Sequence, residues 1–360
     1  MKNGKPTHAH FLKIDADYKT AAETANLIYV SDAIQGIARI KKRSGFSYSY
    51  KNKIVKEPAV LKRIKGLVIP PAWENVWICP FANGHIQATG FDARQRKQYR
   101  YHPLWNELRN ETKFHRMMEF GVALPALRLQ LEEDISNKDL NEKKVLATLV
   151  SLMERTYIRI GSSGYEKMNG SYGLTTLKDK HVKVEGEKLM FSFTGKKGVE
   201  QNITLKNKRL ARLVKQCRDI PGKELFQYYD EAGNKRTVDS GMVNSYIKEA
   251  TGKEFTAKDF RTWAGSLNIL RAFNSIGEAA DEAALKKNVV LALDEVSNKL
   301  GNTRTVCKKY YVHPGLIQLY EENNLSKYLK QLDDIEEPDE KTGYTKDEQV
   351  FMKILKSLSA

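Results

Sequence analysis

Cysteine, long apolar runs and signal-peptide features are all scarce in this sequence of 360 residues. Its three cysteines, Cys79, Cys217 and Cys307, are odd in number and widely spaced. They therefore predict neither a disulfide framework nor a zinc site, and they favour a reducing compartment. No stretch reaches the roughly 18 uninterrupted apolar residues of a membrane-spanning helix, and the opening residues show no apolar run typical of a signal peptide. We expect a soluble, cytoplasmic protein without a membrane partner.

Patterns for nucleotide- and metal-dependent chemistry are also absent. The sequence has no glycine-rich Walker loop, and none of its seven histidines has the H-E-x-x-H spacing of a zinc hydrolase. No carboxylate cluster of the kind that holds Mg²⁺ stands out. We therefore predict no metal, no cofactor and no bound nucleotide. His8 and His10 are interpreted as residues of a tail.

Positive charge, by contrast, is abundant. The chain has 60 Lys and Arg against 44 Asp and Glu, a formal net charge of +16. Residues 1–110 hold 19 basic residues against 8 acidic ones, whereas residues 331–360 hold 4 against 8. Because the excess extends over most of the chain, it indicates a polyanionic partner such as a nucleic acid. A solvated cationic surface is the simpler alternative.

Length and patterning predict an α+β protein of two domains and a tail. At 41% hydrophobic residues the chain can bury a core, and its length suits two domains. Asn83-Gly84 between two short apolar runs is a hairpin signal. The predicted parts are a small, β-rich, mostly antiparallel domain with some helix at 30–42 (residues 1–110), a mostly helical domain (111–330) and an acidic, solvated extension (331–360).

Helical periodicity dominates the second predicted domain. Leu146, Leu149, Val150, Met153 and Tyr157 form one apolar stripe of a helix that ends near Gly161. Alternating residues over 181–205, interrupted by Glu185-Gly186 and by Gly195-Lys196-Lys197-Gly198, predict a small three-stranded sheet with lysines at a turn. Further helices are expected at roughly 206–217, 239–251, 257–273, 276–300 and 314–330.

Isolated basic residues lie beside aromatic or glycine residues in four short segments. These are TYIRIG around Arg159, FTGKKG around Lys196, KDFRTWAG around Arg261, and NTRTVCKKYYVHP, which ends just beyond Tyr311. Taken singly, each has an ordinary structural interpretation: an arginine in an ion pair, a solvated turn lysine, or a partly buried tyrosine. Trp263 and Cys307 are interpreted as packing residues.

Taken together, these segments resemble a known family in their order and spacing. With RTYIRIGSSGYEKMNGSYGLTTLKDKHV, they resemble the catalytic domain of type IB DNA topoisomerases, specifically the compact poxvirus and bacterial kind. GFDARQRKQYRYH resembles the segment with which that family's N-terminal domain reads DNA. The resemblance covers about residues 60 to 325. It implies a small β-rich clamping domain and a helical catalytic domain of the fold shared with tyrosine recombinases.

The resemblance implies five catalytic residues. It places the nucleophile at Tyr311, because the family's phosphate-binding His or Asn precedes its nucleophile by nine residues and Asn302 stands at that distance. Tyr310 is the alternative nucleophile. Arg159 and Arg261 correspond to the two catalytic arginines, and Lys196 to the general acid. Asn302 replaces a histidine of the poxvirus members; an amide donates a hydrogen bond to phosphate but carries no charge.

The same resemblance implies DNA contacts and an activity. Gln98, Tyr99 and Tyr101 correspond to contacts in the major groove and on phosphates, and Tyr165 and Lys258 to contacts near the scissile phosphate. The implied enzyme relaxes positive and negative supercoils of duplex DNA through a 3′-phosphotyrosyl intermediate, without ATP or metal. We expect it to act as a monomer, associated with the nucleoid if bacterial.

Two other functions are compatible with part of this pattern. A tyrosine recombinase shares the Arg, Lys, Arg, Tyr set, but recombinases carry histidine three residues before the second arginine, where this chain has Lys258, and their N-terminal domain is helical. A DNA-binding protein without activity is disfavoured because every proposed catalytic group is present.

Overall fold

The computed structural model describes residues 7–93, 95–332 and 342–359. Its contacts divide the chain into two compact units, Met1–Arg116 and Met117–Ala360. The division falls inside one long helix, α4 (Pro103–Ser136), which also contains the domain boundary predicted after residue 110. No helix among the described residues is long and apolar enough to cross a membrane.

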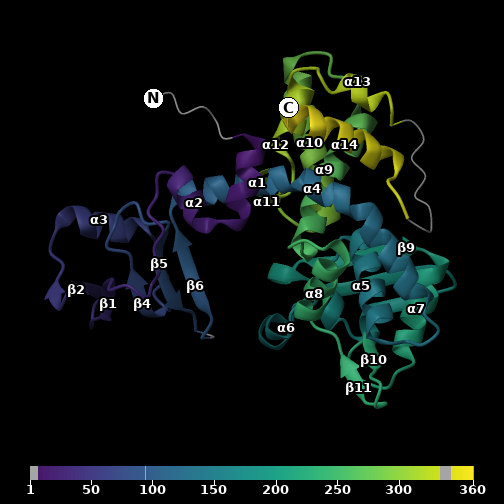
Figure 1. The fold of residues 1–360 in the computed structure, drawn as a ribbon, viewed down its shortest axis with the longest axis horizontal. Coiled ribbons are helices and arrows are strands. Elements are labelled where there is room, and N and C mark those ends of the chain that lie inside the picture. The colour runs from purple at the N-terminus through teal and green to yellow at the C-terminus, as the bar shows by residue number, and fades with distance from the viewer. Residues whose placement is uncertain (1–6, 94, 333–341, 360) are drawn as a thin grey trace. The chain divides into compact units, whose positions relative to one another are not determined.

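A six-stranded antiparallel sheet forms the centre of the first unit, in the order β3-β2-β1-β4-β5-β6 (Figure 1). The hairpin predicted around Asn83-Gly84 is present, with Trp77 on β4 opposite Thr89 on β5. The unit's elements are α1 (His8–Ala16), α2 (Tyr18–Thr24), β1 (Ile37–Lys41), β2 (Phe46–Tyr50), β3 (Lys53–Ile54), α3 (Pro58–Gly66), β4 (Glu74–Ile78), β5 (Ile86–Phe91), β6 (Lys97–Tyr101) and the start of α4.

The helix predicted at 30–42 is wrong, because this region contains strand β1 preceded by turns. The reason lies at Gly36, where a Cβ atom would come within 2.1 Å of the Trp77 indole. The indole occupies that space and donates a hydrogen bond to the carbonyl of Ile34 at 2.9 Å. Pairing with β2 and β4 then extends the backbone from Ile37 onward.

The interpretation of His8 and His10 as tail residues is also wrong, because both lie in α1. The His10 ring is 3.0 Å from the Thr24 hydroxyl on α2, and the His8 ring is 3.0 Å from that of His115. Thr7 begins the helix by accepting a hydrogen bond from the His10 amide. The apolar side of α1 and α2 is buried in a cluster that includes Phe11, Ile14, Trp105 and Leu108.

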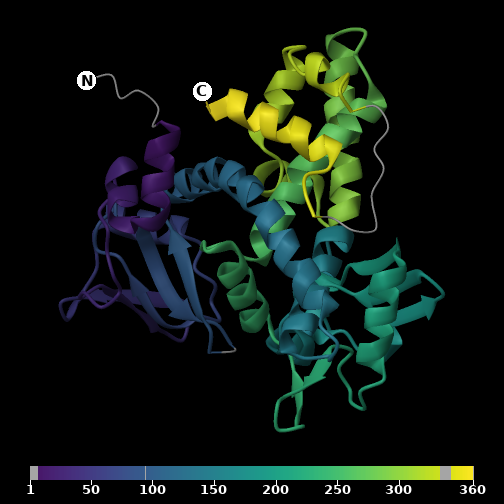
Figure 2. The ribbon, with the colours of Figure 1, turned by 45° about the vertical axis from the view of Figure 1, so that its right-hand side comes forward.

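Helices make up most of the second unit, together with a three-stranded antiparallel sheet in the order β7-β8-β9 (Figures 1 and 2). After α4, its elements are α5 (Glu142–Thr156), α6 (Ser163–Asn169), β7 (Val182–Glu185), β8 (Lys188–Thr194), β9 (Glu200–Lys206), α7 (Lys208–Arg218), β10 (Gln227–Tyr229), β11 (Lys235–Thr237), α8 (Ser240–Thr251), α9 (Ala257–Ile276), α10 (Glu282–Leu300), α11 (Arg304–Tyr310), α12 (Pro314–Glu321), α13 (Ser326–Leu329) and α14 (Lys346–Ser359). Short 3₁₀ turns occur at Leu174–Thr176, Asp179–His181 and Lys196–Gly198.

The apolar stripe predicted from Leu146 to Met153 is buried in α5, as expected. The helix ends at Thr156 rather than near Gly161, because Tyr157 adopts a left-handed conformation with φ of 58°. The predicted small sheet is confirmed by β7, β8 and β9. Two predicted helices differ from the structure: the one at 276–300 begins only at Glu282, after an irregular segment (277–281), and the one at 314–330 is divided at Asn323, whose φ is 56°.

The C-terminal segment, expected to be a solvated extension, is partly buried. Residues 333–341 lie outside the described part of the chain, but α14 packs alongside α9 and contributes Phe351 to a ring contact with Trp263 at 4.8 Å (Figures 1 and 2). Asp347 of α14 accepts a hydrogen bond from Arg271 of α9 at 2.6 Å. The acidic composition of this segment therefore partly reflects ion pairs within the fold.

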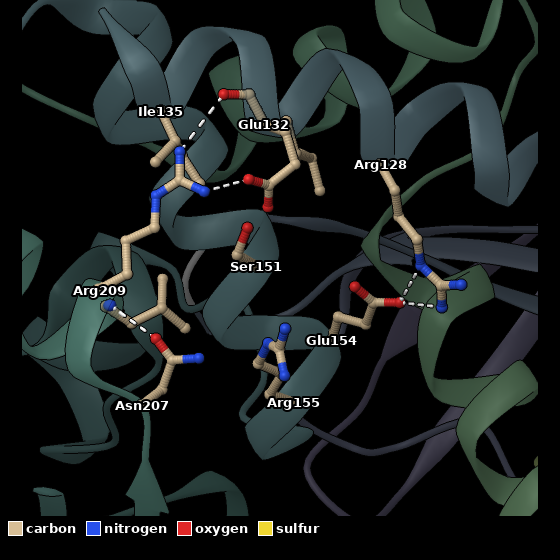
Figure 3. Close-up of a pocket in the computed structure, with 10 residues that line it drawn as sticks. Arg128, Glu132, Ile135, Ser151, Glu154, Arg155, Asn207 and Arg209 are labelled. Carbon is tan, nitrogen blue, oxygen red and sulfur yellow. Dashed lines mark hydrogen bonds and ion pairs between the residues drawn. The ribbon is translucent and has the colours of Figure 1, made fainter. Parts of the chain in front are cut away.

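Arg128 of α4 connects this helix to α5 and α14. Its guanidinium donates to Glu154 of α5, as Figure 3 shows, and to both carboxylate oxygens of Glu348 on α14 at 2.6 and 2.8 Å. Figure 3 also shows Arg209 of α7 paired with Glu132 of α4. The carboxylate partners hold the pKa of Arg128 above its usual range although burial opposes this. The arginine therefore remains charged and depends on both partners.

Glu348→Ala is expected to destabilise the second unit strongly. The substitution removes two charge-assisted hydrogen bonds from the buried Arg128 guanidinium, each worth about 1.5–3 kcal/mol, and leaves Glu154 as its carboxylate partner. Urea unfolding monitored by circular dichroism measures the change. Glu282→Ala is the control, because it breaks a fully exposed ion pair with Lys286 and should barely move the midpoint. Equal midpoints for the two variants would show that α14 does not depend on Arg128.

Candidate active site

Arg159 lies in the extended segment that follows α5. The left-handed turn at Tyr157 takes the chain out of the helix, and the Arg159 carbonyl accepts a hydrogen bond from the Leu174 amide at 2.9 Å. Its Nη2 donates to the carbonyl of Gly301 at 3.1 Å and to Oδ1 of Asn302 at 2.6 Å. The structure therefore brings together two site residues that the sequence separates by 143 positions.

Arg261 lies in the first turns of α9. A capping box formed by Thr256 and Asp259 begins this helix and fixes its N-terminal end. The Arg261 side chain is only 6% exposed; its Nη1 donates to the carbonyl of Tyr157 at 2.5 Å and its Nη2 to that of Leu300 at 2.7 Å. Its Nε is buried and has no hydrogen-bond partner among the described residues.

Neither arginine has a carboxylate partner in the described part of the chain, and both make their hydrogen bonds to neutral oxygens. Burial, followed by the positive charge of Arg261, lowers the pKa of Arg159 to about 10, so that Arg159 is still protonated at neutral pH. Buried charges in proteins are normally paired. Two neighbouring guanidinium groups without a counter-charge are therefore suited to bind an anion.

Asn302 follows Gly301, the left-handed residue that caps the end of α10. The backbone N–H of Asn302 donates to the Ser297 carbonyl at 2.9 Å. Its side chain accepts from Arg159, and this hydrogen bond orients the amide. The Nδ2 group is buried on the side of the Cys307 thiol and has no oxygen or nitrogen acceptor among the described residues. Burial raises the pKa of Cys307 to about 11, so the thiol is neutral at physiological pH.

The two adjacent tyrosines differ clearly in their surroundings. Tyr311 ends α11 and is half-buried, with its ring centroid 5.2 Å from the guanidinium carbon of Arg261. Tyr310 is 44% exposed, with the ammonium of Lys309 5.4 Å from its ring centroid. Tyr311 is thus in contact with a candidate catalytic arginine, which favours it as the nucleophile.

Lys196 is exposed on the turn between β8 and β9. The turn requires a positive φ at Lys197 (65°) and at Gly198 (75°). Lys196, Arg159 and Tyr165 line the same open pocket, which has a volume of about 300 Å³. The lysine therefore lies on the edge of the arginine site, on a hairpin rather than in the helical core.

Gln201 of β9 connects the Lys196 hairpin to the turn that carries Asn302. A Cβ atom at Gly195 would lie 3.0 Å from the Gln201 side chain, and one at Gly301 would lie 2.7 Å from it. The two glycines thus allow one glutamine to pack against both turns. No local sequence pattern predicts this contact, although the glycine before Asn302 is a signal for a tight turn.

The predicted DNA-contacting residues lie on both units: three on β6 of the first and two in the second. On β6, Tyr99 and Tyr101 are 42% and 37% exposed and their rings stack at 5.7 Å, whereas Gln98 donates to Asp92 at 3.0 Å. In the second unit, Tyr165 and Lys258 are exposed. Trp263 and Cys307, interpreted as packing residues, are 5% and 0% exposed.

In this site a tyrosine lies beside two arginines that have no carboxylate partner in the described part of the chain, next to an oriented amide and a lysine-bearing hairpin. On a helical fold, this arrangement defines a class of enzymes that cut a phosphodiester through a tyrosine. The comparisons agree. The family model described as the catalytic core of eukaryotic DNA topoisomerase I matches residues 100–338. The model of the N-terminal domain of bacterial DNA topoisomerase IB matches residues 45–92.

Curated relatives carry the same names. The chain is 34% identical to the DNA topoisomerase 1B of Acanthamoeba polyphaga mimivirus over 298 residues, which cover 81% of this chain and 89% of the relative. It is 22% identical over 237 residues to DNA topoisomerase I of monkeypox virus and to DNA topoisomerase 1B of vaccinia virus, covering 65% of this chain and 72% of each relative. The chain belongs to the type IB DNA topoisomerase family.

Proposed function

We propose that this chain relaxes positive and negative supercoils in duplex DNA by cutting and resealing one strand, with Tyr311 as the nucleophile. The observation that carries the assignment of residues is the contact between Tyr311 and Arg261, in a site where two arginines have no carboxylate partner among the residues that the structure describes. Membership of the type IB family supplies the reaction, and duplex DNA is the substrate.

In the proposed reaction the Tyr311 oxygen attacks the phosphorus and displaces the deoxyribose 5′-oxygen. The bond between phosphorus and tyrosine forms as the bond to the 5′-oxygen breaks, which leaves a 3′-phosphotyrosyl enzyme and a free 5′-hydroxyl. The phenol proton is released, and the leaving oxygen takes up a proton. One phosphodiester replaces another, so the bond energy is retained and resealing requires no nucleotide.

Arg159, Arg261 and Asn302 are proposed to bind the non-bridging phosphate oxygens. Negative charge on these oxygens increases in the five-coordinate transition state, and preorganised donors stabilise it most effectively in a buried site. The Nε of Arg261 and the Nδ2 of Asn302, which have no oxygen or nitrogen acceptor among the described residues, are the candidate donors. Because the two guanidinium groups already supply positive charge, we propose that the reaction needs no metal ion.

Lys196 is proposed to protonate the leaving 5′-oxygen. A lysine ammonium can act as a general acid when it reaches the leaving group, and the hairpin holds Lys196 at the edge of the pocket that Arg159 lines. Its exposure suits a group that approaches the DNA from the solvent side.

DNA contacts are proposed for residues of both units. Exposed Tyr99 and Tyr101 can pack against bases or donate to phosphates, as can Tyr165, and Lys258 can pair with a phosphate. Reading an adenine edge with Gln98 requires both ends of its amide, so its hydrogen bond to Asp92 must be exchanged when DNA binds. We propose that one copy of the chain suffices for the reaction.

The direct test is relaxation of supercoiled plasmid in EDTA without nucleotide. We expect plasmids of either supercoil sign to be fully relaxed by catalytic amounts of enzyme, because the site supplies its own positive charge. A recombinase would act only on plasmids that contain its own sites, and a binding protein would leave the linking number unchanged. Either of those two results would overturn the proposal. Gel electrophoresis in chloroquine resolves the outcomes.

A further inference from the structure

The backbone on either side of Val312 forms a tight connection between two helices. Tyr311 ends α11, and His313 begins α12 by accepting a hydrogen bond from the Gly315 amide on its side chain. Val312 is fully buried, and its amide donates to the Cys307 carbonyl at 3.0 Å. The position of the Tyr311 ring therefore depends on how this three-residue connection is held.

A single buried hydroxyl joins the two ends of this connection. Ser266 of α9 has an exposure of 0%; its Oγ accepts a hydrogen bond from the His313 amide at 2.9 Å and donates one to the Tyr311 carbonyl at 3.2 Å. Both backbone groups lie outside the regular hydrogen bonding of a helix. Ser266 thus satisfies two backbone groups, one on each side of Val312.

The residue before it, Gly265, lies directly against the tyrosine backbone. A Cβ atom at Gly265 would come within 2.5 Å of the Tyr311 carbonyl oxygen and 2.8 Å of the Tyr311 Cβ. These are atoms of the backbone and its first side-chain carbon, which cannot move aside as the end of a flexible side chain can. The absence of a side chain at Gly265 therefore permits this approach.

Arg261 and Gly265 are four residues apart on α9, so they lie on the same face of the helix, one turn apart. Arg261 contacts the Tyr311 ring, whereas Gly265 and Ser266 contact its backbone. One rigid helix thus contacts both ends of the same tyrosine. The distance between the tyrosine and the arginine is consequently determined within α9 itself.

We propose that Gly265 and Ser266 are positioning residues, which hold Tyr311 at the correct distance from Arg261 for attack on the phosphate. The inference rests on the proposed role of Tyr311 as the nucleophile. Neither residue touches DNA or takes part in proton transfer. Their contribution is geometric: displacement of a reacting group by about 1 Å can slow a reaction by about 100-fold.

Gly265→Ala separates this role from a general effect on stability. Alanine favours a helix over glycine by about 1 kcal/mol, so intrinsic propensity alone predicts a more stable α9. We expect instead that single-turnover cleavage of a suicide duplex falls about 100-fold, while the dissociation constant for the duplex changes less than about twofold. Resealing of preformed adduct should slow by a similar factor, because it uses the same tyrosine geometry.

Gly121→Ala on α4 is the matched control, because it crowds α9 at Trp263 and not at Gly265. Its Cβ would lie 2.4 Å from Met352 and 2.8 Å from the Trp263 ring, so it also crowds the contacts of α9, but away from Tyr311. We expect a lower melting temperature with unchanged cleavage per folded molecule. The loss of cleavage rate is compared with the drop in melting temperature in each variant. If this ratio is the same for Gly121→Ala and Gly265→Ala, Gly265 is only a packing residue and the inference is wrong.

Ser266→Ala tests the hydroxyl independently. Without it the Tyr311 carbonyl and the His313 amide lose these two hydrogen bonds, and we expect cleavage to fall about tenfold at nearly constant DNA affinity. Ser266→Thr retains the hydroxyl and should recover most of the rate. If Gly265→Ala and Ser266→Ala both cleave like wild type, the positioning role is refuted, but an adduct on Tyr311 would leave the proposed function intact. Failure to find wild-type adduct on Tyr311 would refute its assignment as the nucleophile, and absence of plasmid relaxation by wild type would refute the proposed function itself.

Discussion

Tyr311→Phe is expected to abolish plasmid relaxation and to leave the affinity for duplex DNA nearly unchanged. The substitution removes one oxygen atom, which is the proposed nucleophile, and no positive charge. Because affinity for duplex DNA depends mainly on cationic contacts with phosphates, binding should persist. The ring itself remains, so its contact with Arg261 and the packing against α9 are retained.

The measurement is trapping of covalent adduct on a suicide duplex, followed by peptide mapping. Wild type should yield a phosphotyrosyl peptide that contains Tyr311, and the Phe variant should yield none. Tyr310→Phe is the matched control, because it removes the same atom from the adjacent, exposed ring and should cleave at close to the wild-type rate. Adduct formation by Tyr311→Phe together with its loss in Tyr310→Phe would reverse the assignment.

The helices of the second unit could be predicted because their apolar residues recur with a helical period that survives in the fold. The stripe from Leu146 to Met153 is buried on α5, and the alternation over 181–205 corresponds to β7, β8 and β9. The ends of helices were less predictable. Tyr157 stops α5 by adopting a left-handed conformation that local composition does not indicate, since tyrosine rarely does so.

The first unit was predicted less well because long-range contacts determine its local structure. Whether residues 37–41 form a helix or a strand depends on pairing with β2 and β4, and on the Trp77 indole that lies over Gly36. Similarly, α1 is stabilised by burial of Phe11 and Ile14 next to Trp105, a residue distant in the sequence. The pairing with β4 and the contacts with Trp77 and Trp105 join distant parts of the chain, so no window of ten residues shows them.

In the candidate site, too, the residues could be identified from the sequence but the contacts among them could not. Its residues were identified through a resemblance in four short segments, but no local pattern indicates that Arg159 donates to Asn302 or that Arg261 contacts Tyr311. Those contacts arise because α9 and α10 bring the segment after α5 and the turn before α11 together. Within the described part of the chain the arginines have no carboxylate partner, which is the strongest physical indication of an anion site and is likewise a property of the fold.

Lys196→Ala is expected to slow cleavage of an ordinary duplex by about 10² to 10⁴-fold, the usual contribution of a general acid. The 5′-oxygen is a poor leaving group unless it is protonated as its bond to phosphorus breaks. Since Lys196 is exposed on a hairpin and packs little, the substitution should leave the melting temperature unchanged. Any loss of rate is then attributable to the chemical step.

A duplex with sulfur in place of the bridging 5′-oxygen distinguishes proton donation from simple charge. A thiolate leaves without a proton, so Lys196→Ala should cleave this substrate at close to the wild-type rate. Lys197→Asn is the matched control: it removes an equal charge from the same hairpin, and asparagine tolerates the positive φ of 65° at that position. Its defect should be small and equal on both substrates. If the defect of Lys196→Ala is as large on the sulfur substrate as on the oxygen one, Lys196 acts on the phosphate by charge, and the proton for the leaving oxygen must come from another group.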